Sequence, residues 1–255
     1  YVFLSVAKEM GLSPTNNKVE SSVALFSTVK ELRDIPNTNL EVLSQNFHQQ
    51  HYTVGEEVLR YQDHTNSVFF ILKGMIRIHY YSLSGDEVIL CDLPEGEMFG
   101  ELTAIDGLAR SATAVALKDS LLASLPSSAF LELIHTYPEF CTAILKRLVG
   151  QVRRLTERVF DFSTLAVRNR IHAELLRLTH KNKVSENLAI ISPAPTHEEL
   201  ANYVSTRREE VSREISVLAR QGIIECRGRA WHILDVAKLA HMVKDVRGSF
   251  DTGKV

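Results

Sequence analysis

Short runs rich in Val, Ile, Tyr and Phe fill the chain between His51 and Leu125, and turn signals separate them about every ten residues. Apolar and polar residues alternate within these runs, for example in Ile76–Tyr80. A period of two is typical of strands that bury one face, and regularly spaced turns are typical of antiparallel connections. The pattern therefore predicts an antiparallel β-barrel, jelly-roll-like, or a β-sandwich.

The pattern changes at Pro138, where a long helical segment begins and continues to about Ala166. Its apolar residues follow alternating steps of three and four: Leu145, Leu148, Val152, Leu155, Val159, Phe162 and Ala166. Two apolar positions per heptad form the narrow contact of a coiled coil, whereas a helix that docks on its own barrel needs a wider stripe. Charged residues fill most other positions: Lys146, Arg147, Arg153, Arg154, Glu157 and Arg158. The segment 138–166 is therefore predicted to be a dimerisation helix in a parallel homodimer.

Beyond this segment, apolar spacing predicts a helix at Val167–His180, followed by a loop up to Pro195. Thr196 and Glu199 have the spacing of a capping box, in which each side chain satisfies a free backbone amide of the other. This box begins a short helix that ends near Tyr203.

A second helix is predicted from Arg207, with Val211, Ile215 and Leu218 on its buried face. A small β-hairpin around Gly228 follows, and Asp235 is expected to cap a last short helix. Two helices joined by a short turn and followed by a hairpin are typical of a winged helix-turn-helix.

The complete chain is thus predicted to be an α+β protein in four segments. The expected boundaries are an N-terminal arm at 1–22, a β-barrel domain at 23–137, the dimerisation helix at 138–166 and the winged helix-turn-helix at 167–247. Helical spacing interrupted at Pro36 predicts two short helices before the barrel. The arm and the tail after residue 247 are expected to be poorly ordered.

The net charge of −2 conceals an uneven distribution along the 255 residues. Residues 168–247 contain 14 Lys and Arg against 10 Asp and Glu, a net charge of +4 that leaves −6 for the remainder. An anionic partner would therefore meet the C-terminal third of the chain.

The rest of the composition excludes several classes of protein. The three cysteines, Cys91, Cys141 and Cys226, are scattered, and single histidines have no partner at ligand spacing, so no disulfide framework and no metal site are expected. No apolar run approaches the ~20 residues of a membrane span, and no basic leader is present, which favours a cytoplasmic protein. No nucleophile–base set is present, so we do not expect an enzyme.

One long insertion, Met98–Ala114, interrupts the rhythm of the strands. Gly100 allows close approach of the backbone to a ligand, Glu101 can accept the protons of sugar hydroxyls, and Arg110 can donate to two phosphate oxygens. Together they suit a ribose and a phosphate. Without further context, a turn with a surface ion pair explains the same residues.

The order F-G-E-L-x(6)-A-R-S-A-T in this insertion resembles the phosphate-binding cassette of cyclic-nucleotide-binding domains. The resemblance implies that Glu101 binds the ribose 2′-hydroxyl and that Arg110 binds the cyclic phosphate of cAMP or cGMP. It also implies closing contacts from Gly100, Leu102, Ser111 and Ala112.

Exposed charges lie near the start of the second helix of the predicted helix-turn-helix. Arg208 and Arg213 could each hold the O6 and N7 atoms of guanine, and Glu209 could accept from cytosine. A solvated helix face with a Glu209–Arg213 ion pair would explain these charges equally well.

The motif R-E-x-V-x-R at 208–213 resembles the recognition helix of the cAMP receptor protein and fumarate–nitrate regulator superfamily, whose domain order also matches. The resemblance implies base contacts from Arg208, Glu209 and Arg213, and phosphate contacts from Thr196 and Arg207 and from the wing residues Arg227 and Arg229. It implies a cyclic-nucleotide-dependent transcription regulator that binds a near-palindrome of double-stranded DNA as a homodimer, with RNA polymerase as a further partner.

Some positions depart from the pattern of the superfamily. Ser205 and Arg207 stand where a glycine and a serine are common, and the hydroxyl pair near the adenine is reduced to Thr156. The N-terminal cysteine cluster of the fumarate–nitrate regulators is missing, which disfavours oxygen sensing. A regulator of this architecture with another effector, or a nucleotide-sensing protein-interaction module, remains an alternative.

Overall fold

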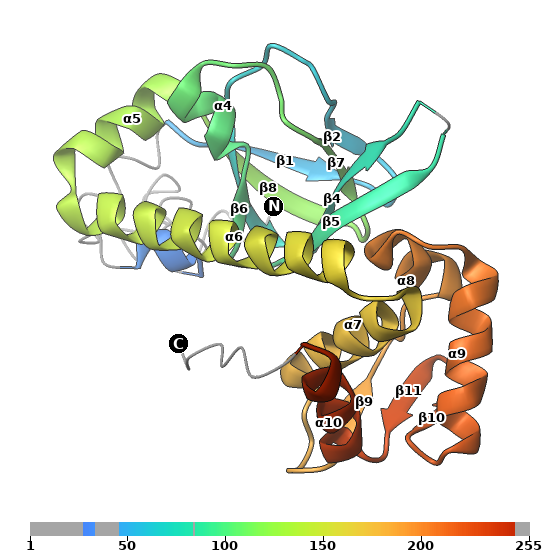
Figure 1. The fold of residues 1–255 in the computed structure, drawn as a ribbon. Helices are drawn as coiled ribbons and strands as arrows, with labels where there is room; N and C mark the ends of the chain where they lie inside the picture. The colour runs from blue at the N-terminus through green and yellow to red at the C-terminus, as the bar shows by residue number, and fades with distance from the viewer. Residues whose placement is uncertain (1–27, 34–45, 84, 248–255) are drawn as a thin grey trace, which may run out of the picture. The chain divides into compact units, whose positions relative to one another are not determined.

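The structure is a computed structural model that describes residues 28–33, 46–83 and 85–247 (Figure 1). The expected arm, most of the two helices expected before the barrel and the expected tail lie outside these residues. The described chain begins with a 3-10 helix, η1, at Lys30–Leu32. The chain divides into two compact units. The first comprises the residues up to 80 and residues 90–150, and the second comprises residues 81–89 and the chain from residue 151.

The eight strands between His48 and Leu125 form two four-stranded sheets. One has the order β1 (His48–Tyr52), β8 (Ser120–Leu125), β3 (Val68–Lys73), β6 (Met98–Phe99), and the other has the order β2 (Glu57–Leu59), β7 (Thr113–Ala116), β4 (Met75–Tyr81), β5 (Glu87–Pro94). The pairs β1–β8, β3–β8, β2–β7 and β4–β7 are antiparallel. The predicted antiparallel β architecture is confirmed.

The side chains of β3 alternate between two hydrophobic clusters, as a period of two requires. Ile71 joins a cluster that also contains Ile76 and Ala114 of the other sheet, so the two sheets share one core. Phe70 and Leu72 join a second cluster. That second cluster lies on the outer face of the first sheet, because neighbouring strand residues point to opposite faces.

Helices cover this outer face. α5 (Ser127–Thr136) contributes Phe130 and α6 (Pro138–Thr164) contributes Phe140 and Ile144 to the cluster of Phe70. The short helix α4 (Glu101–Asp106) interrupts the strands between β6 and β7, and its Ala104 joins the same cluster. The first half of α6 is therefore a docked helix, and α5 is an element that the sequence pattern had not predicted.

The contact face of α6 differs from the predicted heptad at two residues, Leu148 and Ala166. Ala166 lies beyond the end of the helix. Leu148 packs against the barrel cluster, whereas Val149 is 53% exposed. A straight helix has 3.6 residues per turn, so a strict repeat of seven drifts around its surface. The exposed apolar seam, as we call it, consists of Leu145, Val149, Val152, Leu155, Val159 and Phe162. The helix ends at Thr164, two residues before the expected boundary.

The second unit contains the C-terminal fold. Its elements are α7 (Val167–Lys181), β9 (Ala189–Ile191), α8 (His197–Val204), α9 (Arg208–Arg220), β10 (Ile224–Arg227), β11 (Ala230–Ile233) and α10 (Val236–Arg247). The sheet has the order β10-β11-β9, so the predicted hairpin around Gly228 gains a third strand from a segment that was expected to be a loop. Asp235 caps α10 as predicted, because its Oδ1 accepts from the Lys238 amide at 2.9 Å.

Arg170 on α7 ties together the ends of two helices in this unit. It donates to the carbonyls of Val204 (3.1 Å) and Ser205 (3.2 Å) at the end of α8, and to the Leu165 carbonyl (3.3 Å) just after α6. Its guanidinium also lies 5.4 Å from the centre of the Phe162 ring. Carbonyls at helix C-termini lack partners within the helix, so a cation is stabilising there. Arg170 thereby fixes α8 against the end of α6.

None of the helices in the described ranges combines the length and the apolar character needed to cross a membrane.

Candidate functional site

The insertion between β6 and β7 forms a tight turn into α4. Gly100 is the N-cap residue with φ of +84°, Glu101 opens the helix and is 4% exposed, and Leu102 is 41% exposed. The free amides of a helix start therefore lie beside a buried carboxylate. Such a turn can hold a polar ligand at its backbone while Glu101 accepts a hydroxyl proton.

Arg110 is 2% exposed and is held by the loop between β2 and β3. Its Nε donates to Thr65 Oγ1 at 3.0 Å, its Nη2 to the Ser67 carbonyl at 2.7 Å and its Nη1 to the Gly100 carbonyl at 3.0 Å. These bonds use three of the five N–H groups of the guanidinium and leave two for an anion. Burial lowers the pKa of Arg110, with Asp63 and Glu101 acting in the opposite direction, and arginine remains a cation in proteins.

The two halves of the predicted pair are thus brought together. Glu101 and Arg110 are both buried, and Arg110 bonds to the carbonyl of Gly100, the residue next to Glu101. Of the other predicted contacts, Ser111 is exposed and Ala112 is half-buried directly after Arg110. A buried acceptor and a buried cation on one turn suit a ligand that carries both hydroxyl and phosphate groups.

Thr156 belongs to the second unit, on α6, where it is exposed. Its Oγ1 donates to the Val152 carbonyl at 2.9 Å, so the hydroxyl presents its lone pairs outward.

Gly100→Ala should weaken nucleotide binding by about tenfold, because the added Cβ would lie 2.8 Å from Arg110 Nη1 and 3.1 Å from the Ser67 carbonyl and would displace the guanidinium. The strain of a side chain at positive φ, roughly 1–2 kcal/mol, adds to this effect. Titration calorimetry with cAMP measures the change. Gly107→Ala is the control, because it has φ of +72° and no atom within 4 Å of the added Cβ. Equal losses in both variants would show that strain, not crowding of Arg110, is responsible.

The start of the helix-turn-helix is built as the sequence predicted. Thr196 and Glu199 form the capping box, with the Glu199 amide donating to Thr196 Oγ1 at 3.1 Å and the Thr196 amide donating to Glu199 Oε2 at 2.9 Å. The Thr196 hydroxyl also donates to Glu199 Oε2 at 3.1 Å. Arg207 is the exposed N-cap residue of α9 and makes no side-chain cap bond.

Arg208, Glu209 and Arg213 line one surface pocket together with Ser212. The structure thus brings the three predicted base contacts together. Arg213 pairs with Glu210 at 2.8 Å and not with Glu209, and this exposed pair is of the kind that the solvated-face alternative describes. This pair is exposed and contributes about 0–1 kcal/mol, so Arg213 can leave it at small cost.

The opposite face of α9 is buried. Val211, Ile215 and Leu218 join the core of the unit, as predicted. Glu214 is also buried, and its Oε1 lies 2.6 Å from Nε2 of His172 on α7. The charged face that carries Arg208 and Arg213 is therefore directed away from the core.

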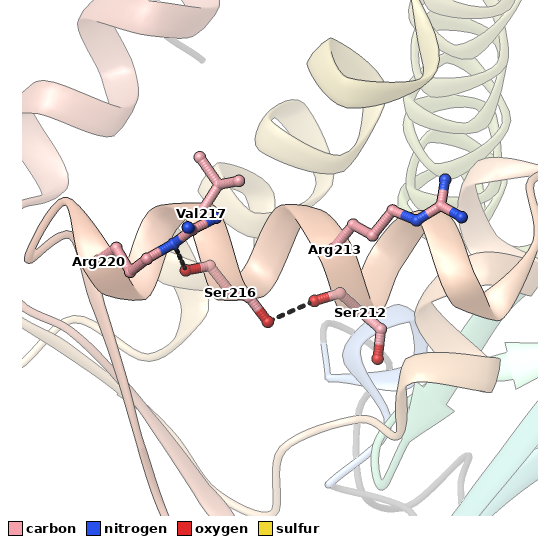
Figure 2. A pocket seen from close by; sticks show the side chains of 5 residues that line it. All are labelled: Ser212, Arg213, Ser216, Val217 and Arg220. Atoms are coloured by element: carbon pink, nitrogen blue, oxygen red, sulfur yellow. Dashed lines mark hydrogen bonds between the residues drawn. The ribbon is translucent and has the colours of Figure 1, made fainter.

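A second pocket continues this face along α9, lined by Ser212, Arg213, Ser216, Val217 and Arg220 (Figure 2). Ser216 donates to the Ser212 carbonyl at 2.8 Å, and Arg220 donates to the Ser216 carbonyl at 3.3 Å. Ser212, Ser216 and Arg220 were not among the residues predicted from the sequence. Their signal was the spacing of four that starts at Arg208, which keeps residues on one helix face.

Polar contacts also reach the candidate DNA surface from α8 and from the wing. His197 Nδ1 lies 2.8 Å from Ser212 Oγ, and burial together with the charge of Arg208 lowers the pKa of His197. In the wing, Arg227 pairs with Glu225 at 2.7 Å, and Arg229 is exposed. The exposed arginines of α9, its N-cap and the wing are those at 207, 208, 213, 220, 227 and 229.

In the part of the chain that the structure describes, no three or more His, Cys, Asp and Glu side chains are grouped so that they could hold a metal ion.

Family models match both parts of the chain. A family model of the cyclic nucleotide-binding domain matches residues 49–137, and a model of the Crp-like helix-turn-helix domain matches residues 169–242.

Named relatives match most of the chain. The chain is 31% identical over 178 residues to the cyclic AMP receptor protein of Thermus thermophilus, covering 70% of this chain and 80% of the relative. It is 26% identical over 195 residues to the cAMP-activated global transcriptional regulator Vfr of Pseudomonas aeruginosa, covering 75% of this chain and 91% of the relative. The structure of a CooA mutant from Carboxydothermus hydrogenoformans has the same fold, with a TM-score of 0.69 at 19% identity over 78% of this chain and 88% of that chain.

Proposed function

The chain belongs to the cAMP receptor protein and fumarate–nitrate regulator family of cyclic-nucleotide-binding transcription regulators, and on this premise we propose that cAMP is its effector and that it binds DNA as a homodimer. The observation that carries the proposal is the cassette itself. Buried Glu101 and buried Arg110 flank the start of α4, and Gly100 leaves room for the guanidinium. In the proposed complex Glu101 accepts the ribose 2′-hydroxyl, Arg110 binds the cyclic phosphate, and Leu102, Ser111 and Ala112 close the site.

The hydroxyl of Thr156 supports adenine over guanine as the base. Because it donates to the Val152 carbonyl, it offers acceptor lone pairs to a base. The 6-amino group of adenine is a donor, whereas O6 of guanine is an acceptor. Ser111 is an exposed hydroxyl that could serve guanine, so cGMP is the competing effector.

Calorimetric titration of the full chain with cAMP and cGMP tests this assignment. We expect saturable binding of cAMP, and weaker binding of cGMP. Tighter binding of cGMP would reverse the assignment of the base, and the absence of binding to either nucleotide would refute the proposed function.

The exposed apolar seam of α6 supports the homodimer. Val152, Leu155 and Val159 are each more than half exposed, and they repeat at steps of three and four. Large apolar side chains that are exposed in a row along one helix are typical of an interface. We therefore propose that two copies of α6 pair through this seam.

In the dimer, two α9 helices would read successive major grooves of a near-palindrome, about 34 Å apart. Arg208, Glu209 and Arg213 are the proposed base contacts. Arg207 is a proposed phosphate contact, and so is Thr196, whose hydroxyl proton must turn from Glu199 to the phosphate. The nucleotide raises DNA affinity if it binds more tightly to the dimer form in which both helices fit the grooves.

Arg213→Ala should cost about 1–3 kcal/mol of affinity for a duplex that the full chain selects from random DNA, and should relax the base preference at one position of each half-site. Arg207→Ala is the matched comparison. It should weaken binding equally for all sequences and reduce the salt slope by about 1. Fluorescence anisotropy with the selected duplex and its single-base variants distinguishes the two effects. A uniform loss for Arg213→Ala would place Arg213 on a phosphate.

RNA polymerase is the proposed protein partner, by analogy with the family. A regulator that binds the chromosome acts in the compartment that contains it, which we propose is the cytoplasm. We propose no catalytic reaction for this chain.

A further inference from the structure

A buried ion cluster lies under the cassette carboxylate, within the first unit. Arg147 of α6 is its centre, and its side chain is 9% exposed. Nη1 of Arg147 lies 2.6 Å from Glu97 Oε2 and 3.3 Å from Glu31 Oε1, and Nη2 donates to the Met98 carbonyl. Nε lies 3.8 Å from Oε1 of Glu101. One guanidinium from α6 thus joins η1, the turn before β6 and the first residue of α4.

Opposite charges in this cluster counteract the effect of burial on each other's pKa. Burial acts to lower the pKa of Arg147, but Glu101, Glu97 and Glu31 together raise it. Burial likewise acts to raise the pKa of Glu97, but Lys30 and Arg147 lower it. Removal of one partner from a buried ion pair leaves an uncompensated charge and is strongly destabilising. Arg147 therefore compensates part of the buried charge of Glu31 and Glu97.

The nitrogen atoms of the Arg147 guanidinium differ in the contacts that they make. Both of its Nη atoms are committed to Glu97, Glu31 and the Met98 carbonyl, whereas Nε makes no hydrogen bond within the described residues. The 3.8 Å between Nε and Glu101 is within ion-pair range but too long for a hydrogen bond. Arg147 thus attracts the Glu101 carboxylate by charge, without a hydrogen bond from its Nε.

We propose that Arg147 is a positioning residue that holds the Glu101 carboxylate in the orientation in which it meets the ribose 2′-hydroxyl of the nucleotide. The inference rests on the proposed function of Glu101. It adds that recognition of the ribose depends on the dimerisation helix, because Arg147 lies on the same helix as the exposed apolar seam. A merely structural Arg147 would anchor α6 to the barrel and support every part of the site equally.

The test is the affinity ratio of cAMP to its 2′-deoxy analogue, measured by calorimetry on the full chain. A hydrogen bond to a charged group should give the wild type a preference for cAMP of about tenfold or more. Glu101→Gln should bring the ratio close to one. Lys146→Gln is the matched control, because it removes an exposed cation from the same turn of α6 and should leave the ratio unchanged.

Two variants probe Arg147 without leaving three buried carboxylates uncompensated. Arg147→Gln combined with Glu97→Gln keeps the charge of the cluster constant, and the ratio should fall to less than about threefold. Arg147→Lys keeps the cation but not the planar fork, and should restore an intermediate ratio.

The outcomes separate the two claims. If the wild type prefers cAMP and both Arg147 variants keep that preference while total affinity falls, Arg147 is a packing residue and the inference is overturned. If the wild type binds neither nucleotide, the proposed function itself fails. If it binds both equally, the assignment of Glu101 to the ribose fails, and the role of Arg147 fails with it.

Discussion

Arg110→Ala should lower the affinity for cAMP by at least about 100-fold, because truncation of one partner of a buried charged contact costs about 2–5 kcal/mol. The phosphate would lose its cation, and the carbonyls of Ser67 and Gly100 would lose a donor in a site where Arg110 is 2% exposed. The dimer should persist, since Arg110 lies on the cassette and not on α6. Calorimetry measures the affinity, and sedimentation measures the mass.

Arg60→Ala is the control for this experiment. Arg60 lies in the loop after β2, its side chain is 69% exposed, and it pairs with Glu57 at 2.9 Å on the surface. Its loss should change the affinity for cAMP by less than about twofold, as expected for a surface pair. If Arg110→Ala left nucleotide binding unchanged, the cassette would not be the nucleotide-binding site.

Val152→Glu should convert the dimer to monomers and lower DNA affinity by at least about 100-fold. Val152 is 61% exposed in the centre of the exposed apolar seam. In a parallel pair each copy meets its own counterpart, so the substitution places two like charges together, which costs several kcal/mol. Sedimentation equilibrium reports the mass, and fluorescence anisotropy with the selected duplex reports DNA affinity.

Arg153→Glu introduces the same acid one residue later, at an exposed position outside the seam. It should leave the dimer intact, so a comparison of the two variants separates the seam from general charge effects on α6. A Val152→Glu protein that remains dimeric would show that the protein dimerises through another surface.

Local chemistry made much of this fold predictable. The capping box of Thr196 and Glu199 and the cap at Asp235 need only residues a few positions apart, and both occur as predicted. The buried face of α9 followed from helical spacing. The cassette followed from one run of residues, because Gly100, Glu101 and Arg110 lie close together in the sequence.

The predictions that were wrong concern residues whose structure depends on contacts with distant segments of the chain. β9 is only three residues long and forms by pairing with β11, some forty residues later, so no local period identifies it. Leu148 was predicted in the coiled-coil contact and Arg147 among the charged residues at the other positions of the helix, but both are turned toward the barrel. The charge of Arg147 predicts exposure unless its three carboxylate partners are known, and these come from three separate elements.

The residues that hold the functional side chains could not be predicted from the sequence either. Thr65 and Ser67 fix the Arg110 guanidinium, yet in the sequence they are ordinary turn residues more than forty positions away. His172 holds Glu214 behind α9 through a contact that no spacing indicates. Sequence motifs thus predicted the groups that meet the ligand and the DNA, and the structure was needed for the groups that support them.

The central claim is that a cyclic nucleotide in the cassette changes how tightly the dimer holds DNA. The most direct measurement is the affinity of the full chain for the selected duplex, by fluorescence anisotropy, without nucleotide and with saturating cAMP. We expect saturating cAMP to raise the DNA affinity of the wild type by about 5- to 150-fold, which corresponds to typical coupling free energies, and to leave that of Arg110→Ala unchanged. Equal affinity of the wild type in both conditions would contradict it.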